Sequence, residues 1–162
     1  MKTLTMLVLG LGLTVSALGN AAGLAVVDLA KVVENSTYLK QQNASLTQSI
    51  KPTSTKLEQL NKEIESLQQR AQSANQGDLQ KLSAQFQAKV NEFTTTQQGL
   101  QAKVQSSIQA SNNVFETRLK QAAEQLRKEN NVDFILNKNT VIASDAQYDL
   151  TDKMIQKINA MK

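Results

Sequence analysis

Apolar residues recur at intervals of three and four along most of the chain between residues 38 and 130, which is otherwise rich in Gln, Ser, Lys and Glu. Up to residue 74 they fill two heptad positions, one with Ile50, Leu57, Ile64 and Ala71, the other with Leu46, Thr53, Leu60, Leu67 and Ala74. The repeat resumes with Leu79, Leu82, Phe86, Val90, Phe93, Leu100 and Val104, then shifts by one position through Ile108, Phe115 and Ala122. A sustained heptad repeat predicts long helices packed as a coiled coil.

A single break interrupts this repeat at Asn75-Gln76-Gly77-Asp78. Gly77 can adopt the positive φ that ends a helix, and Asp78 can cap the helix that follows. The pattern therefore predicts an antiparallel helical hairpin over residues 37–130, with its tip near residues 74–78. At 1.5 Å per residue, an arm of about forty residues extends on the order of 60 Å, so the hairpin must project from the rest of the protein.

Four residues near the middle of the arm weaken the repeat. Pro52 interrupts the first helix, Thr53 and Gln97 place polar groups in the seam, and Gly99 lies nearby in the second helix. Proline removes a helical hydrogen bond, and glycine has a low helix propensity. Each residue alone is equally compatible with an imperfection that a long coiled coil tolerates. Because they cluster at one level of both helices, we interpret them as an arm hinge.

The segment before the arm has a different pattern. The run from Leu24 to Asp28 is apolar and contains two β-branched residues, which predicts a buried strand. A short helix from Leu29 to about Glu34 should follow it.

The segment after the arm returns to strand-like sequence. Residues 133–136 and 140–143 predict a β-hairpin that turns at residues 137–139. Asp149 is the expected N-cap of a final amphipathic helix, with Asp152 in its first turn. We therefore expect an α+β fold, predominantly helical, with a long coiled-coil hairpin projecting from a small β-containing body.

This body, formed by residues 22–36 and 131–162, should be an oligomerisation domain. It has only about 45 residues, near the size at which a single core struggles to outweigh chain entropy, and its short strands leave open edges. Both problems are solved if several protomers pool their strands, so we predict an obligate oligomer. The strand residues expected at the shared core are Val26, Val27, Phe134, Ile135, Val141 and Ile142.

Residues 1–21 have the order of a secretory signal peptide, because Lys2 precedes an apolar run and small residues follow it. We predict cleavage after Ala21 and export of the mature chain. The alternative is an uncleaved membrane anchor. The apolar run is, however, shorter than the roughly 20 residues that cross a bilayer, and two glycines interrupt it.

The composition removes most catalytic chemistry. Cys and His are both absent, which excludes thiol nucleophiles, disulfides, His general bases and the usual zinc, copper and haem ligand sets. One acidic cluster, Asp145, Asp149 and Asp152, could hold a hard cation such as Ca²⁺, but helix capping explains Asp149 and Asp152 without an ion. We therefore expect no enzyme activity, no cofactor and no metal site.

The formal charge of +4 favours acidic partners through long-range attraction. Basic residues alternate with acids along the arms, which is typical of solvated helix faces, and no dense basic stripe or aromatic platform indicates nucleic-acid binding. The arm phenylalanines fit seam positions, although some could face a cavity. The candidate binding surface of the arm comprises Lys62, Arg70, Lys81, Phe86, Lys89 and Phe93.

Three parts of the chain together resemble the Skp/OmpH family of periplasmic chaperones for outer-membrane proteins. They are the strand LAVVD at residues 24–28, the Gln- and Lys-rich hairpin, and VDFILNKNTVIAS followed by DLTDKMIQKI. The resemblance covers the whole chain and is most specific at residues 24–28 and 132–158. It implies a homotrimer in which the strand-bearing parts form a central β-body and three hairpins extend like tentacles around a cavity.

The resemblance also implies a function. Members of this family hold unfolded outer-membrane proteins in that cavity, without ATP, during transit to the outer membrane. Their tentacle ends are strongly basic and linked to lipopolysaccharide binding, whereas here the tip holds Arg70 and Lys81 beside Asp78. The resemblance therefore gives only weak support to a peripheral contact with lipopolysaccharide or an anionic membrane. The alternative interpretation is a structural or adaptor coiled-coil protein of the cell envelope.

Overall fold

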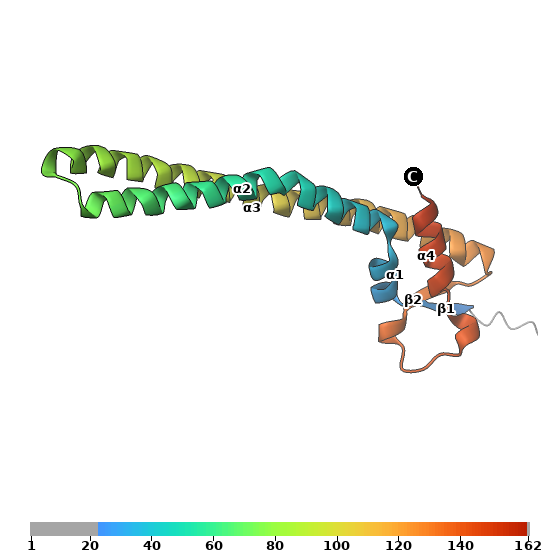
Figure 1. The fold of residues 1–162 in the computed structure, drawn as a ribbon. Helices are drawn as coiled ribbons and strands as arrows, with labels where there is room; N and C mark the ends of the chain where they lie inside the picture. Colours follow the sequence, from blue (N-terminus) through green and yellow to red (C-terminus); the bar gives the residue numbers. More distant parts are fainter. Residues whose placement is uncertain (1–22, 162) are drawn as a thin grey trace, which may run out of the picture.

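The computed structural model describes residues 23–161, and the predicted signal peptide, residues 1–21, lies outside this range. Figure 1 shows two long helices that run side by side to a distant tip, and a small body at their other end. The elements, in order, are β1 (Leu24–Val27), α1 (Leu29–Asn35), α2 (Thr37–Gln72), α3 (Gln76–Glu129), β2 (Phe134–Asn137) and α4 (Thr151–Ala160). Two 3₁₀ turns, Lys138–Thr140 and Ala146–Tyr148, connect β2 to α4.

The helices α2 and α3 form the predicted antiparallel hairpin, which confirms the coiled-coil arm (Figure 1). At 1.5 Å per residue, the 36 residues of α2 span about 54 Å. The 54 residues of α3 continue beyond the start of α2, and Phe115, Ala122 and Leu126 are buried in the core of the body. The arm and the body are therefore joined by one continuous helix.

The tip of the hairpin is capped differently from the prediction. Asn75 is the N-cap of α3, and its Oδ1 accepts a hydrogen bond from the backbone N–H of Asp78 at 3.0 Å. Gly77 lies inside the first turn of α3, and no glycine in residues 23–161 has a positive φ. The prediction that Gly77 ends a helix and Asp78 caps the next is therefore wrong. The amide side chain of Asn75 satisfies the free helix N–H groups, so a left-handed glycine is not required.

The two strands pair in parallel, with Ala25 opposite Ile135. Parallel strands need a long connection, and here the whole helical hairpin provides it. On its other side β1 is bound by the segment before α4, since the N–H of Leu150 donates to the carbonyl of Val26 at 2.9 Å. The small sheet therefore joins segments from both ends of the described chain.

The predicted β-hairpin of residues 133–136 with residues 140–143 is wrong. Residues 138–140 form a 3₁₀ turn, and residues 141–143 are not in a strand. Local side-chain bonds close this turn: Asn137 Oδ1 accepts from the N–H of Asn139, and Thr140 Oγ1 donates to the carbonyl of Asn137. Asn and Thr commonly divert the backbone in this way, and β2 pairs with β1 instead.

The body contains the fully buried core of the protein. It is built from the sheet, α1, the end of α3 and α4, and its buried residues are Ala25, Val27, Val32, Phe115, Ala122, Leu126, Leu150, Met154 and Ile158. The amphipathic pattern predicted for the last helix is confirmed, because Met154 and Ile158 are almost completely buried. This core fixes the base from which the arm projects.

Aspartates bind the first turns of the short helices α1 and α4, but only one of them is an N-cap. Asp28 caps α1 by accepting from the N–H of Lys31 at 3.1 Å. Asp149 lies one residue before the N-cap position of α4, which Leu150 occupies, and its Oδ1 accepts from the N–H of Thr151 at 2.9 Å. Asp152 lies in the first turn as predicted. Asp149 therefore binds the first residue of α4 without being its N-cap.

The junction between α3 and β2 needs an unusual backbone conformation. Asn131 has a φ of 51°, and the N–H of Val132 donates to the carbonyl of Arg127 at 3.0 Å, as in a Schellman helix end. A Cβ on Gly23 would lie 2.9 Å from the carbonyl oxygen of Asn131. Only glycine at position 23 therefore lets the first residue of the described chain pack against this turn. None of the helices in residues 23–161 is both long and apolar enough to cross a membrane.

Candidate functional site

The two edges of the arm differ in charge. On α2, Ser49, Lys56, Glu63 and Arg70 are spaced one heptad apart along one edge of the seam, and we call this edge the charged flank. Ser54, Asn61 and Gln68 are spaced in the same way along the other edge, which we call the uncharged flank. In a coiled coil these two rows border the apolar seam from opposite sides.

Bonds between α2 and α3 lie along the charged flank. Nζ of Lys56 is 2.9 Å from Oε1 of Glu92, and Nζ of Lys89 is 2.7 Å from Oε2 of Glu63. Closer to the body, Nζ of Lys103 donates to the backbone carbonyl of Ser49 at 2.9 Å. Three polar contacts, one in each of three successive heptads of α2, therefore connect α2 to α3 along the charged flank.

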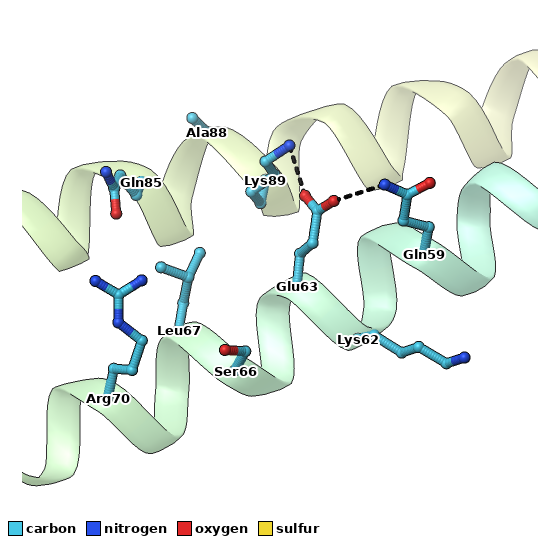
Figure 2. A pocket seen from close by; sticks show the side chains of 9 residues that line it. All are labelled: Gln59, Lys62, Glu63, Ser66, Leu67, Arg70, Gln85, Ala88 and Lys89. Atoms are coloured by element: carbon cyan, nitrogen blue, oxygen red, sulfur yellow. Dashed lines mark hydrogen bonds and ion pairs between the residues drawn. The ribbon is translucent and has the colours of Figure 1, made fainter.

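The ion pairs shift the titration of their members. The hydrogen bond from Lys89 is the main cause that lowers the pKa of Glu63, and a bond of 3.0 Å from Gln59 lowers it further. Lys56 lowers the pKa of Glu92 in the same way, and Glu63 raises the pKa of Lys89. Figure 2 shows Glu63 between Lys89 and Gln59. Both carboxyl groups are therefore held in their charged form.

An open groove of about 510 Å³ lies along the charged flank (Figure 2). Four of its lining residues are charged: Lys62, Glu63, Arg70 and Lys89. In Figure 2 the side chain of Lys62 points away from α3, whereas Lys89 is bound to Glu63. Of the predicted binding residues, Lys62, Arg70 and Lys89 therefore lie together on this side, and Lys81 is exposed near the tip.

The uncharged flank opens directly onto the apolar seam. A groove of about 570 Å³ near the tip is lined by Leu67, Gln68, Ala71, Gln72, Leu79, Leu82, Ser83 and Phe86, none of which is charged. A second groove, of about 520 Å³, contains Leu57 and Phe93 together with Asn61 and three charged residues at its rim. Ser54 and Asn61 bond within α2 rather than across to α3. On this side the seam is accessible to an apolar partner.

The predicted binding residues therefore do not form one cluster. Phe86 and Phe93 are half-buried and line the two grooves of the uncharged flank. Arg70 and Lys89 lie at the charged flank and Lys81 near the tip, while Lys62 lines both the charged groove and the Phe93 groove. Leu79, which the heptad pattern assigns to the seam, is instead 41% exposed. The signal that could have found this difference is the heptad pattern of the rows beside the seam, charged on one edge and uncharged on the other.

The lower part of α3 departs from the predicted seam. Ile108 is 47% exposed, and Gln97 is also exposed, so neither lies in the seam as predicted. Ser107 and Ser111 are half-buried at this level instead. Apolar residues spaced by four, Leu100, Val104 and Ile108, rotate away from a seam of period 3.5, which is the physical reason for the difference.

The predicted hinge residues stand in unbroken helices. Pro52 is exposed inside α2, which continues on both sides of it, and Thr53 beside it is half-buried. Gly99 is exposed inside α3, and a Cβ there would meet no atom within 4 Å. The structure thus has one continuous conformation of the arm, and the hinge stays a prediction.

The predicted oligomerisation residues fall into two groups. Val26 and Val27 are buried within the protomer, and Ile135 is half-buried in β2. Phe134 is 57% exposed, and Ile142 is fully exposed outside any strand. Near them a groove of about 570 Å³ is lined by residues that include Leu24, Leu136, Val141 and Tyr148.

Two of the three acidic residues considered for a cation, Asp145 and Asp149, have other partners. Asp149 accepts from Lys138 at 2.6 Å, and this bond, followed by the bond from Thr151, lowers its pKa to about 2. Asp145 accepts from the N–H of Gln147 at the start of a 3₁₀ turn. Within residues 23–161, no three His, Cys, Asp or Glu side chains are grouped so that they could hold a metal ion.

The family model described as "Outer membrane protein (OmpH-like)" matches residues 23–158, which includes both the arm and the body. This chain belongs to the OmpH-like family. The resemblance to the Skp/OmpH family found in the sequence is thereby confirmed.

Two similar proteins agree with this assignment. A Skp-like protein of Pseudomonas aeruginosa is 23% identical over 143 residues, which cover 86% of this chain and 85% of that protein. The crystal structure of an OmpH-like protein from Caulobacter crescentus CB15, described as a candidate outer membrane chaperone, superposes with a TM-score of 0.73 at 20% identity. It covers 86% of this chain and 85% of the other, and it establishes that this OmpH-like protein shares that fold.

Proposed function

We propose that this OmpH-like protein is an ATP-independent chaperone of the periplasm that holds unfolded outer-membrane proteins between its helical arms and prevents their aggregation. The observation that carries this proposal is the uncharged flank, where Leu79 is exposed and Phe86 is half-buried beside the seam. Unfolded outer-membrane proteins expose alternating apolar side chains. A shallow apolar groove binds such side chains through area rather than through one fixed geometry.

The arm is suited to binding many sequences weakly. Its grooves are open, and their polar residues near the tip are amides and hydroxyls, which bind either donors or acceptors. Several arms acting on one client would convert weak contacts into tight capture. The net positive charge and the exposed Lys62, Arg70 and Lys81 would speed the encounter with acidic clients, so association should slow as salt rises.

The proposal includes a homotrimer held together by the body. In one protomer β2 has an open edge, and Phe134, Leu136 and Ile142 expose apolar surface near it. Exposed edges and apolar side chains of this kind are usually covered in an assembly. The mass of the purified mature protein in solution tests this part. A trimer supports it, and a stable monomer at micromolar concentration would overturn it.

Export is the remaining part of the proposal. The signal peptide of residues 1–21 would direct the chain to the periplasm, where cleavage after Ala21 would leave a mature protein beginning at Ala22. The mass and first residue of the protein recovered from the periplasmic fraction check both the compartment and the cleavage position.

The experiment that tests the function is an aggregation assay with several unrelated unfolded outer-membrane proteins. The mature protein should suppress aggregation of all of them without ATP. An adaptor for one folded partner would leave the panel unprotected, and that result would favour the structural alternative.

Substitutions on the two flanks of the arm should affect client binding differently. The double variant Phe86→Ser and Phe93→Ser should weaken client binding by about thirtyfold or more, because each substitution removes roughly 1 kcal/mol or more of apolar contact. Val114→Ser is the matched control, since Val114 is an exposed apolar residue of α3 that lines neither of these grooves. Arg70→Ser with Lys81→Ser, at exposed residues that line neither of these grooves, should slow association at low salt and leave dissociation unchanged.

A further inference from the structure

The weakest turn of α2 lies just before Pro52. A proline has no N–H for the carbonyl four residues earlier, and its ring crowds the preceding turn. The carbonyl of Gln48 therefore lacks its helical donor, although α2 continues through this point. The turn that contains Gln48 and Ser49 is the least able to stay straight by its own hydrogen bonds.

Side chains of α2 add to this weakness. Ser49 Oγ donates to the carbonyl of Leu46 at 2.9 Å, Ser54 Oγ to that of Ile50 at 3.2 Å, and Thr55 Oγ1 to that of Lys51 at 3.1 Å. Hydroxyl groups that bond back to the preceding turn compete with the helical hydrogen bonds and often bend a helix. Both sides of Pro52 are therefore loosened by the local sequence.

One donor to this turn comes from the opposite helix. Nζ of Lys103, on α3, donates to the backbone carbonyl of Ser49 at 2.9 Å. The two other contacts of the charged flank, Lys56 with Glu92 and Lys89 with Glu63, join side chains only. Lys103 is different because it holds the backbone of α2 itself. A charged donor makes a stronger bond than a neutral one.

We propose that Lys103 is a latch, which holds the proline-weakened turn of α2 against α3, so that the arm bends at this level when the bond between Lys103 and Ser49 opens. Gly99 lies one turn before Lys103, in open space where packing does not require glycine. Glycine makes α3 locally easier to bend beside the latch. The latch does not depend on the proposed chaperone function, since it concerns the arm alone.

Hydrogen–deuterium exchange of the mature protein tests the latch. Lys103→Met should speed exchange of the amides of residues 49–51 and 53–56 by about threefold to tenfold, because the turn loses a charged hydrogen bond. Lys40→Met is the matched control, since Lys40 is also exposed, carries the same charge and makes no ion pair within residues 23–161. Exchange unchanged by Lys103→Met would overturn the proposal.

The link to proline is tested by Pro52→Ala, which restores the missing N–H. In the Pro52→Ala protein, Lys103→Met should change exchange by less than about twofold, because the helix then holds this turn itself. An equal effect of Lys103→Met with and without Pro52 would show that Lys103 acts independently of the weak turn, and would refute the latch.

A second measurement follows the bend directly. The chain has no cysteine, so spin labels can be placed at Ala44→Cys and Gln69→Cys, exposed positions on either side of Pro52. Labelled protein diluted with unlabelled protein should give a broader distance distribution for Lys103→Met than for the unchanged sequence. Identical distributions would contradict a latch that controls bending.

Discussion

The body and the arm are built by different means although α3 runs through both. The body has a core in which Val27, Leu126, Met154 and Ile158 are almost completely buried. In the arm most seam residues are half-buried, and polar contacts on one flank connect the helices. Burial of apolar area, as in the body, stabilises a fold more than solvent-exposed polar contacts such as those of the arm. The body can therefore fix a base, while the arm remains open to partners and to bending.

The largest expected effect is in the body. Ile158→Ala removes a fully buried side chain of α4 and should lower the free energy of unfolding by about 2–5 kcal/mol. The same kind of truncation in the arm, Leu57→Ala, should cost about 1 kcal/mol, because Leu57 is half-buried beside a groove. Urea unfolding of both variants measures the two losses in free energy of unfolding. Equal losses would show that apolar burial does not stabilise the body more than the arm.

A smaller effect is expected at the start of α4. Asp149→Ala removes the bonds from Thr151 and Lys138 and should cost about 1–2 kcal/mol, as for loss of a helix cap. Because the folded pKa of Asp149 is about 2, below its ordinary 3.8, this contribution is present above pH 4 and is lost as the pH falls toward 2. Unfolding measured from pH 6 to pH 2 should converge for the two proteins at the acid end.

A gain of stability is expected at the arm–body junction. Asn131 adopts a left-handed conformation with a φ of 51°, in which glycine has no steric penalty. Asn131→Gly should therefore raise the free energy of unfolding by about 0.5 kcal/mol. Thermal unfolding checks the sign, and Asn130→Gly, at the preceding residue with a φ of −102°, should be destabilising instead.

The smallest effect concerns the charged flank of the arm. The folded pKa values of Glu63 and Glu92 lie below the ordinary 4.5, so the contacts between the helices are complete above about pH 4.5 and weaken as the pH falls below it. Both side chains are partly exposed to solvent, at 35% and 41%, and the effect should therefore be small and reduced by salt. Amide exchange of the arm, compared at pH 6 and at acid pH after correction for intrinsic rates, should accelerate relative to that of the body.

Much of the arm could be predicted because its information is local. The spacing of Ile50, Leu57 and Ile64 by seven residues predicts a helix and the face that it buries. The antiparallel hairpin follows from one polar break in a long repeat. The seam assignments failed on α3, at Gln97 and Ile108, because whether a residue enters a seam depends on how the partner helix is rotated.

The body was harder to predict because its pairing is not local. Residues 134–137 form a strand, close to the predicted one, but their partner is β1, more than a hundred residues away in the sequence. A hairpin within residues 133–143 was the nearest alternative, and Asn137 and Thr140 prevent it by closing a local turn. Strand pairing is decided by which surface the rest of the core leaves available.

For the candidate binding residues, too, the sequence determined some properties and the tertiary structure decided others. The sequence determined which residues are apolar, which are charged, and that they recur along two long helices, because periodicity is a property of the chain itself. Only the tertiary structure decided that Phe86 and Phe93 open onto an uncharged flank while Lys89 is bound to Glu63 on the other. The physical reason is that exposure and ion pairing depend on the neighbouring helix, which packing places beside each residue.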